Sequence, residues 1–432
     1  KLNANIPKTM TLNNRFKLSL MMFLEFFVWG SWYVTLGTFL GNNLQANGSQ
    51  LAAAFSTQSI GAIVAPFVIG LIADRFFNAE KILGVLHLLG AGLMYMMFSS
   101  YSFIAFYPYV LAYMIIYMPT LALVNSVSFN QMKDPAKEFS TIRVWGTVGW
   151  IASGLMISYF FVWDSSASIG EGMLRNTFLM SSISSVVLGL FAFTLPKTPP
   201  VVSQKGDKQS IVEILGLDAL KLLKDKDFAI FFLSSILICI PLAFYYQNAN
   251  PFLSEVGLTN PTGKMTIGQV SEVLFLLMMP FFFKKFGLKI TLIVGMVAWV
   301  VRYVFFAFGD AGEGTYLLLI GIALHGICYD FFFVAGQIYT DSKAGPKYKS
   351  SAQGLITLAT YGVGMLIGFW IAGIVSDSYL EADGMHIWKN IWLIPSGIAL
   401  LVTVIFVLFF KDKDFIKANA ERDSLKNNNI TE

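Results

Sequence analysis

The longest polar stretch between apolar segments is LPKTPPVVSQKGDKQSIVEILGLDALKLLKDKD, at residues 195–227. Its prolines and dense charges exclude it from the hydrocarbon core of a bilayer. On both sides of it the sequence repeats apolar segments of about 20 residues, the length that a helix needs to cross a membrane. Six predicted spans precede it and six follow: 16–40, 51–73, 81–100, 103–130, 140–162, 174–194, 228–253, 266–283, 288–308, 314–338, 350–376 and 388–410.

The composition agrees with a membrane protein. Hydrophobic residues make up 56% of the 432 residues and charged residues only 13%, which is too little polar surface to cover a soluble globule of this size. The predicted fold class is an all-α membrane protein with twelve transmembrane helices in two six-helix halves. We expect an N-terminal half at 1–194, a cytoplasmic linker with an amphipathic helix at 195–227, a C-terminal half at 228–410 and a cytoplasmic tail at 411–432.

The basic residues predict the orientation. Of the 30 Lys and Arg residues, all but five fall in alternate connections and tails that would share one side of the membrane. By the positive-inside rule this side is the cytoplasm, so both termini are expected there. These short basic loops suit anionic lipid headgroups and do not form the basic stripe of a nucleic-acid-binding protein. The exceptions are Arg175, Lys264 and Lys389 on the other side, and Arg143 and Arg302 within spans.

Two six-helix halves joined by a cytoplasmic linker are typical of transporters whose halves rock about a central site. The connection after the second span reads Gly70-Leu-Ile-Ala-Asp74-Arg75 and is followed by Lys81. It resembles the signature loop of the major facilitator superfamily, which implies a gating role for Asp74 and Arg75. The corresponding connection in the second half, residues 284–289, keeps basic residues and a glycine but lacks the aspartate.

Five of the ionisable residues within the predicted spans need an explanation, because a charge in the membrane costs about 2.5–3.5 kcal/mol on insertion scales and is therefore a candidate for function. A structural ion pair is the alternative for Glu272, Arg302 and Asp330. Three acids face two bases, however, so at least one carboxyl group is expected to be protonated in the low dielectric. Proton binding of this kind is what proton-coupled transport requires. The five residues are Glu25, Arg143, Glu272, Arg302 and Asp330.

Helical spacing places several of these residues beside aromatic and polar neighbours in the first half. Glu25 shares a face with Trp29 and Trp32, which suits a planar, hydrogen-bonding solute; the alternative is that Glu25 pairs with a base while the tryptophans pack. Arg143 and Thr147 are also four residues apart. We favour a cavity for them, although Arg143 could instead act as a cytoplasmic gate or a lipid contact.

The second half offers a comparable set. Gln269 and Glu272 are three residues apart on one helix face, and an amide beside a carboxylate can bind hydroxyl groups. His325 and Tyr329, four apart, are predicted to stack, whereas Tyr329 points about 100° away from Asp330. The remaining candidates lie on two further spans, Tyr246 and Gln247 before Pro251, and Gln353 in a stripe with Thr357 and Tyr361.

Seven stretches together resemble the nucleoside:proton symporter family of the major facilitator superfamily. The resemblance covers nearly the whole chain and implies proton-driven uptake of nucleosides across a bacterial cytoplasmic (inner) membrane, normally by a monomer. It also implies that Arg143, Thr147, Gln269, Glu272, Tyr329 and Asp330 line the binding cavity, with Glu272 and Asp330 as leading proton carriers. The matching stretches are Phe27–Trp32, Tyr117–Leu121 continuing to Asn125, Ile142–Thr147, Gln269 with Ser271 and Glu272, Ala298–Arg302, Tyr329–Phe331 and Ser351–Gly354.

Three departures from that family leave the cargo open. Glu25 replaces an amide, His325 stands where an aromatic hydroxyl is expected, and Ala243 and Tyr246 occupy positions where amides bind the solute. Another neutral polar solute, such as a modified nucleoside, nucleobase or sugar, is therefore the alternative cargo. An enzyme or receptor is disfavoured because the sequence has no nucleophile motif, phosphate-binding loop or paired His/Cys metal set, and we expect no cofactor and no metal.

Overall fold

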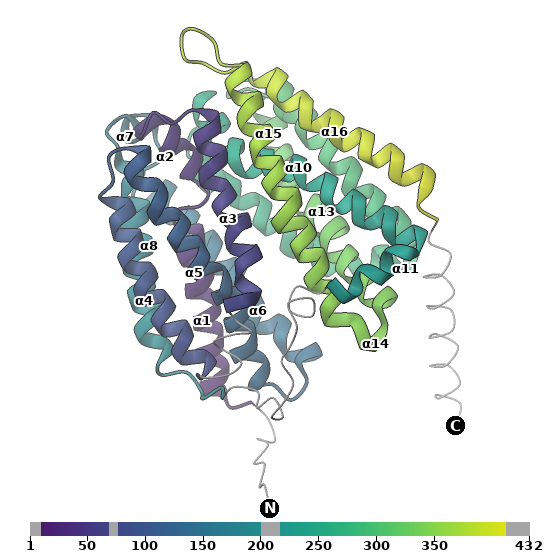
Figure 1. Ribbon diagram of the computed structural model, residues 1–432. Helices are drawn as coiled ribbons and strands as arrows, with labels where there is room; N and C mark the ends of the chain where they lie inside the picture. The colour runs from purple at the N-terminus through teal and green to yellow at the C-terminus, as the bar shows by residue number, and fades with distance from the viewer. Residues whose placement is uncertain (1–9, 69–76, 200–216, 412–432) are drawn as a thin grey trace, which may run out of the picture. The chain divides into compact units, whose positions relative to one another are not determined.

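The computed structural model describes residues 10–68, 77–199 and 217–411, and this part of the chain is almost entirely helical (Figure 1). Eight of its helical segments are long and apolar enough to cross a membrane. One of them, the 48-residue α11 (Pro261–Phe308), contains two predicted spans, separated at Gly287, where φ is 74°. The described residues of the predicted spans at 16–40, 51–73 and 140–162 are largely helical but are not among the eight.

The elements before the linker are α1 (Leu12–Gly30), α2 (Leu36–Asn43), α3 (Gly48–Val68), α4 (Ala79–Phe98), α5 (Phe103–Asn130), α6 (Pro135–Leu155), the π-helix η2 (Met156–Phe160), α7 (Ser166–Gly170), the 3₁₀-helix η3 (Met173–Arg175) and α8 (Asn176–Ala192). Those after it are the 3₁₀-helix η4 (Leu217–Lys224), α10 (Lys226–Glu255), α11, α12 (Thr315–Ala323), α13 (His325–Tyr329), the π-helix η5 (Asp330–Val334), α14 (Ala335–Thr357), the π-helix η6 (Leu358–Gly364), α15 (Met365–Ser378) and α16 (Trp388–Phe409).

The chain forms two compact units that do not follow the linker. The first unit comprises Lys1–Lys208, Phe244–Thr266 and Phe369–Met385, and the second comprises Gln209–Ala243, Ile267–Gly368 and His386–Glu432. One end of each of α10, α11 and α15 therefore belongs to the first unit. The division into halves at 1–194 and 228–410 remains a prediction from the sequence.

Three helix pairs build most of the first unit: α1 packs on α6, α4 on α8 and α3 on α5 (Figure 1). Leu18 and Met22 of α1 share a buried apolar core with Leu83 of α4, Leu123 of α5 and Leu188 of α8. Burial of apolar side chains at this interface holds α1, α4, α5 and α8 together.

The start of α3 has a partner for each of its first backbone amides. Asn47 and Gln50 form a reciprocal capping box, with Asn47 Oδ1 accepting from the Gln50 amide at 2.9 Å and Gln50 Oε1 accepting from the Asn47 amide at 3.1 Å. Asp377 of α15 accepts from the amides of Gly48 at 2.6 Å and Ser49 at 3.2 Å. A carboxylate is well placed at a helix N-terminus because of the helix dipole.

Further polar contacts join the C-terminal segments of the first unit to its other helices. Thr38 of α2 donates to Asn250 of α10 at 2.6 Å, and Asn250 donates to Thr262 of α11 at 3.1 Å. Asn248 also donates to Ser376 of α15 at 3.0 Å. Hydrogen bonds between small side chains thus supplement the apolar packing at this end of the unit.

The described part of the linker packs on α14 in the second unit. Ala219 is buried against Ala344 and Ala352, and the flanking Leu217 and Leu222 pack on the same cluster. Residues 217–224 form a 3₁₀-helix whose apolar side chains lie on this cluster. Residues 200–216, which hold most of the predicted amphipathic helix, lie outside the described part, so that helix stays a prediction.

We predict that Asp377→Ala lowers the free energy of unfolding by about 1–2 kcal/mol, because two amides at the start of α3 lose a charged cap. Denaturant unfolding of the purified full chain in detergent measures this loss. Asp377→Asn keeps an acceptor and should lose less than half as much. Equal stability of wild type and Asp377→Ala would contradict the capping role.

Candidate solute and proton site

Two helices of the second unit bring the predicted carboxylates together. Gln269 and Glu272 lie half-buried in the first part of α11. Asp330 follows α13 directly and opens the π-helix η5. A π-helical turn adds a residue to the helix and changes the direction of the side chains around it, and such turns are frequent at functional sites.

A close helix contact fixes the position of His325 beside Glu272. The amide of Gly326 donates to Ser271 Oγ at 2.9 Å, and a Cβ atom at Gly326 would lie 2.5 Å from the Ser271 carbonyl group. Only glycine therefore allows this approach of α13 to α11. The result places His325 Nε2 at 3.9 Å from Glu272 Oε2.

Arg302 holds the other side of the same imidazole. Its Nη1 lies 3.0 Å from His325 Nδ1, and its fully buried guanidinium lies 5.6 Å from the ring centres of both Trp299 and Phe306. The predicted stack of His325 on Tyr329 is confirmed, with ring centres 5.8 Å apart and planes at 28°.

Asp330 occupies an unusual environment. It is 1% exposed, and neither carboxylate oxygen makes a hydrogen bond with any residue that the structure describes. The backbone of Leu276 faces it without reaching hydrogen-bond geometry, and Glu272 is the charged neighbour. Two carboxylates in one apolar site repel each other when both are ionised, so this arrangement favours the presence of a proton.

A second π-helix contributes to the site. Tyr361 lies within η6, and its hydroxyl oxygen is 2.5 Å from that of Tyr329. Gln353 lies further along the same helical segment, where its amide nitrogen donates to Asp341 at 2.6 Å and to the Gln337 carbonyl at 2.8 Å. Helical periodicity suggested Tyr361 as a cavity residue, but nothing in the sequence predicted its pairing with Tyr329.

In the first unit the predicted solute-binding residues line a half-buried face of α1 and α6. The guanidinium of Arg143 lies 4.1 Å from the ring centre of Phe26. Trp29 contacts Trp150 edge to face, with ring centres 5.5 Å apart, and Thr147 lies half-buried on α6. A cation, a hydroxyl and broad aromatic surfaces therefore occur on neighbouring helices of this unit.

Glu25 is in the interior of the first unit and not on that face. Its side chain is fully buried, with one oxygen 2.8 Å from His87 Nε2 and the other accepting from the Thr120 hydroxyl at 2.6 Å. Trp32 is also fully buried, against Tyr113 and Phe178. This placement favours the structural alternative for both residues.

The other predicted residues are more dispersed. Tyr246 is half-buried beside Tyr33, whereas Gln247 is fully buried, with its amide facing the backbone of Phe369 and Gly373 at 3.2 Å. Asp74 and Arg75 lie outside the described residues. Within the described ranges no group of three His, Cys, Asp or Glu side chains could hold a metal ion.

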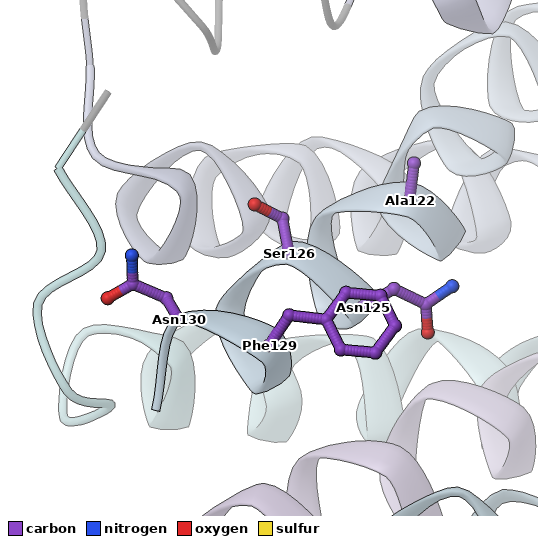
Figure 2. A pocket seen from close by; sticks show the side chains of 5 residues that line it. All are labelled: Ala122, Asn125, Ser126, Phe129 and Asn130. Atoms are coloured by element: carbon purple, nitrogen blue, oxygen red, sulfur yellow. The ribbon is translucent and has the colours of Figure 1, made fainter. Parts of the chain in front are cut away.

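A pocket of about 530 Å³ lies along the last two turns of α5, as Figure 2 shows. Two amides and a hydroxyl give it a polar lining. Ser128, by contrast, points inward and donates to the Val124 carbonyl of its own helix. The lining residues are Ala122, Asn125, Ser126, Phe129 and Asn130.

A helical fold with ionisable groups buried inside membrane-spanning segments is typical of secondary transporters. The chain belongs to the nucleoside H⁺ symporter family, whose pattern it matches over residues 12–415. It is 44% identical to YegT of Escherichia coli K12 over 92% of this chain and 94% of that protein. It is also 35% identical to the xanthosine permease of the same organism, over 94% of this chain and 98% of the permease.

Solved structures agree. The crystal structure of the nucleoside transporter NupG superimposes with a TM-score of 0.82 at 31% identity, covering 93% of this chain and all of that one. A POT family transporter, at 14% identity and a TM-score of 0.69, shares the fold alone. These comparisons confirm the predicted major-facilitator fold, the predicted family and proton-coupled nucleoside transport. They also confirm that the chain is a multi-pass membrane protein of a transporter family.

We predict that Glu25→Ala lowers the free energy of unfolding by about 3 kcal/mol or more, because it leaves the buried His87 and Thr120 without their carboxylate partner. Glu25→Gln keeps hydrogen-bonding capacity and should cost less than half of that. Denaturant unfolding in detergent compares them. Wild-type stability of Glu25→Ala combined with loss of proton-driven uptake would favour a coupling role for Glu25.

Proposed function

We propose that this chain imports nucleosides across a bacterial cytoplasmic membrane and that Glu272 and Asp330 together carry the coupling proton. One observation carries the assignment of the proton site: both oxygens of Asp330 are buried without a hydrogen bond in the described structure, and Glu272 is the charged neighbour. An ionised carboxylate is costly in that position, whereas a protonated one is tolerated.

The same pair can couple the proton to the cargo. A transporter exchanges between states that expose its site to one side or the other, and a ligand shifts that exchange only through its different affinity for the states. Protonation removes the repulsion between Glu272 and Asp330, so it favours the state in which the two carboxyl groups lie closest. Release of the proton on the cytoplasmic side restores the repulsion.

For the nucleoside, the second unit offers Gln269 and Glu272 to sugar hydroxyl groups and the half-buried ring of Tyr329, which stacks on His325, to the base. Arg143, Thr147 and Trp29 of the first unit are proposed to take part as well, and so are Tyr246, Gln247 and Gln353. The amides of Gln247 and Gln353 already have partners, so these two would have to exchange them for the solute. Cytoplasmic termini and a monomeric state complete the proposal.

Another polar solute of similar size is the second candidate. His325, fixed between Arg302 and Glu272, offers a basic ring where relatives are expected to have a hydroxyl, which favours a change in cargo preference. A thermal-shift panel of uridine, adenosine, xanthosine, free bases and sugars decides between the two. Stabilisation by sugars or free bases without nucleosides would replace the nucleoside as the cargo.

We predict that Asp330→Asn and Glu272→Gln abolish accumulation of radiolabelled nucleoside above equilibrium in proteoliposomes with an inward proton gradient. Asp330→Asn is expected to keep exchange of internal for external nucleoside, because the neutral amide mimics the protonated carboxyl group. Comparing uptake with and without the gradient separates these effects.

Glu313→Gln is the matched control, since it removes an exposed carboxylate and should accumulate nucleoside as wild type does. If wild-type uptake is indifferent to the gradient, symport is refuted for this chain. If both site variants still concentrate nucleoside, the proton is carried elsewhere.

A further inference from the structure

The contact between Arg302 and His325 determines which nitrogen of the imidazole carries the proton. A guanidinium has only donors, so the 3.0 Å contact between Arg302 Nη1 and His325 Nδ1 is a hydrogen bond only when Nδ1 has a free lone pair. The ring is then the neutral tautomer with its hydrogen on Nε2. The stack on Tyr329 and the close approach at Gly326 hold the ring in this orientation.

This tautomer directs an N–H group towards Glu272. The separation of 3.9 Å between His325 Nε2 and Glu272 Oε2 is too long for a direct hydrogen bond. It is short enough for one oxygen atom to lie within about 2.8 Å of both, as a bridging group requires. The Glu272 side chain is 29% exposed and that of His325 only 4%, so a solute reaches the pair from the side of Glu272.

The bridging group must accept from Nε2–H and donate to a carboxylate. A hydroxyl group does both through one atom, whereas a base carbonyl cannot donate and an exocyclic amine is a poor acceptor. We propose that Arg302 is a positioning residue that fixes the His325 tautomer, and that Nε2–H of His325 and the carboxylate of Glu272 together bind one hydroxyl group of the nucleoside sugar. The choice of cargo in this inference rests on the proposed function above.

The tautomer can be measured without any nucleoside. The chain has only three histidines, so a ¹⁵N spectrum of histidine-labelled protein in lipid is simple, and the His325 signals are those lost in His325→Asn. The proposal expects a protonated, pyrrole-type Nε2 and a pyridine-type Nδ1. The reverse assignment, or a charged ring at neutral pH, would overturn it.

Variants at Arg302 test what fixes the tautomer. Arg302→Met removes the donor and should give a mixture of the two tautomers, whereas Arg302→Lys, another side chain with donors only, should retain the wild-type spectrum. The fold of each variant is checked by its melting temperature. A folded Arg302→Met with an unchanged spectrum would show that Arg302 does not set the tautomer.

The hydroxyl site is tested by binding of uridine and its 2′-, 3′- and 5′-deoxy analogues to the full chain. Wild type should bind one analogue about 10-fold more weakly than uridine, as expected for a lost hydrogen bond to a charged group. His325→Asn keeps an acceptor for Arg302 but has no donor at the Nε2 position, so its penalty for the same analogue should fall to about 3-fold or less. His325→Gln restores a donor there and should recover most of the discrimination.

The ¹⁵N spectra and the binding measurements together test the inference separately from the proposed function. If no nucleoside binds, the proposed cargo fails, and the spectra still decide the role of Arg302. If uridine binds but all three deoxy analogues bind equally well, or if His325→Asn retains the full penalty, the hydroxyl site is refuted while nucleoside transport stands.

Discussion

A carboxylate inside an apolar helix bundle must be paired, hydrogen-bonded or protonated, because an isolated charge is poorly solvated there. This chain meets the constraint in two ways. Glu25 is fully buried but has His87 and Thr120 within 2.8 Å, so its charge is compensated by fixed partners. Asp330 is equally buried and has no hydrogen bond in the described structure, so protonation is the remaining way to remove its charge. The same residue chemistry thus serves structure in one unit and, in the proposed function, transport in the other.

The geometry around Asp330 depends on small deviations from regular helix. The glycine at 326 lets α13 approach α11 closely enough for the Ser271 hydrogen bond, which sets the distance from His325 to Glu272. The π-helical turns then place Asp330 and Tyr361. Such irregular backbone is tolerated inside a membrane protein where neighbouring helices satisfy the backbone groups, and it commonly marks a site of function.

The sequence predicted the fold well because the bilayer imposes a strong length and polarity signal. It placed the helices on both sides of the linker, and the four-residue spacing of His325 and Tyr329 correctly predicted their stack. Helical periodicity cannot predict contacts between side chains that lie far apart in the sequence. His87 lies 62 residues from Glu25, and Arg302 lies 23 residues from His325, so neither pair leaves a local pattern. The boundaries of the compact units also depend on contacts between distant segments.

Glu272 is the point at which proton and cargo can influence each other. It neighbours Asp330, and it also shares the proposed hydroxyl site with His325. A hydroxyl group that donates to Glu272 favours its ionised form, so a proton held by the pair then lies on Asp330. Conversely, a proton on Asp330 frees Glu272 to accept the hydroxyl group. By linkage each ligand strengthens the binding of the other by the same factor, and couplings of about 1–3 kcal/mol are typical. In the proposed site, a shared carboxylate therefore gives symport a direct physical basis within one unit of the chain.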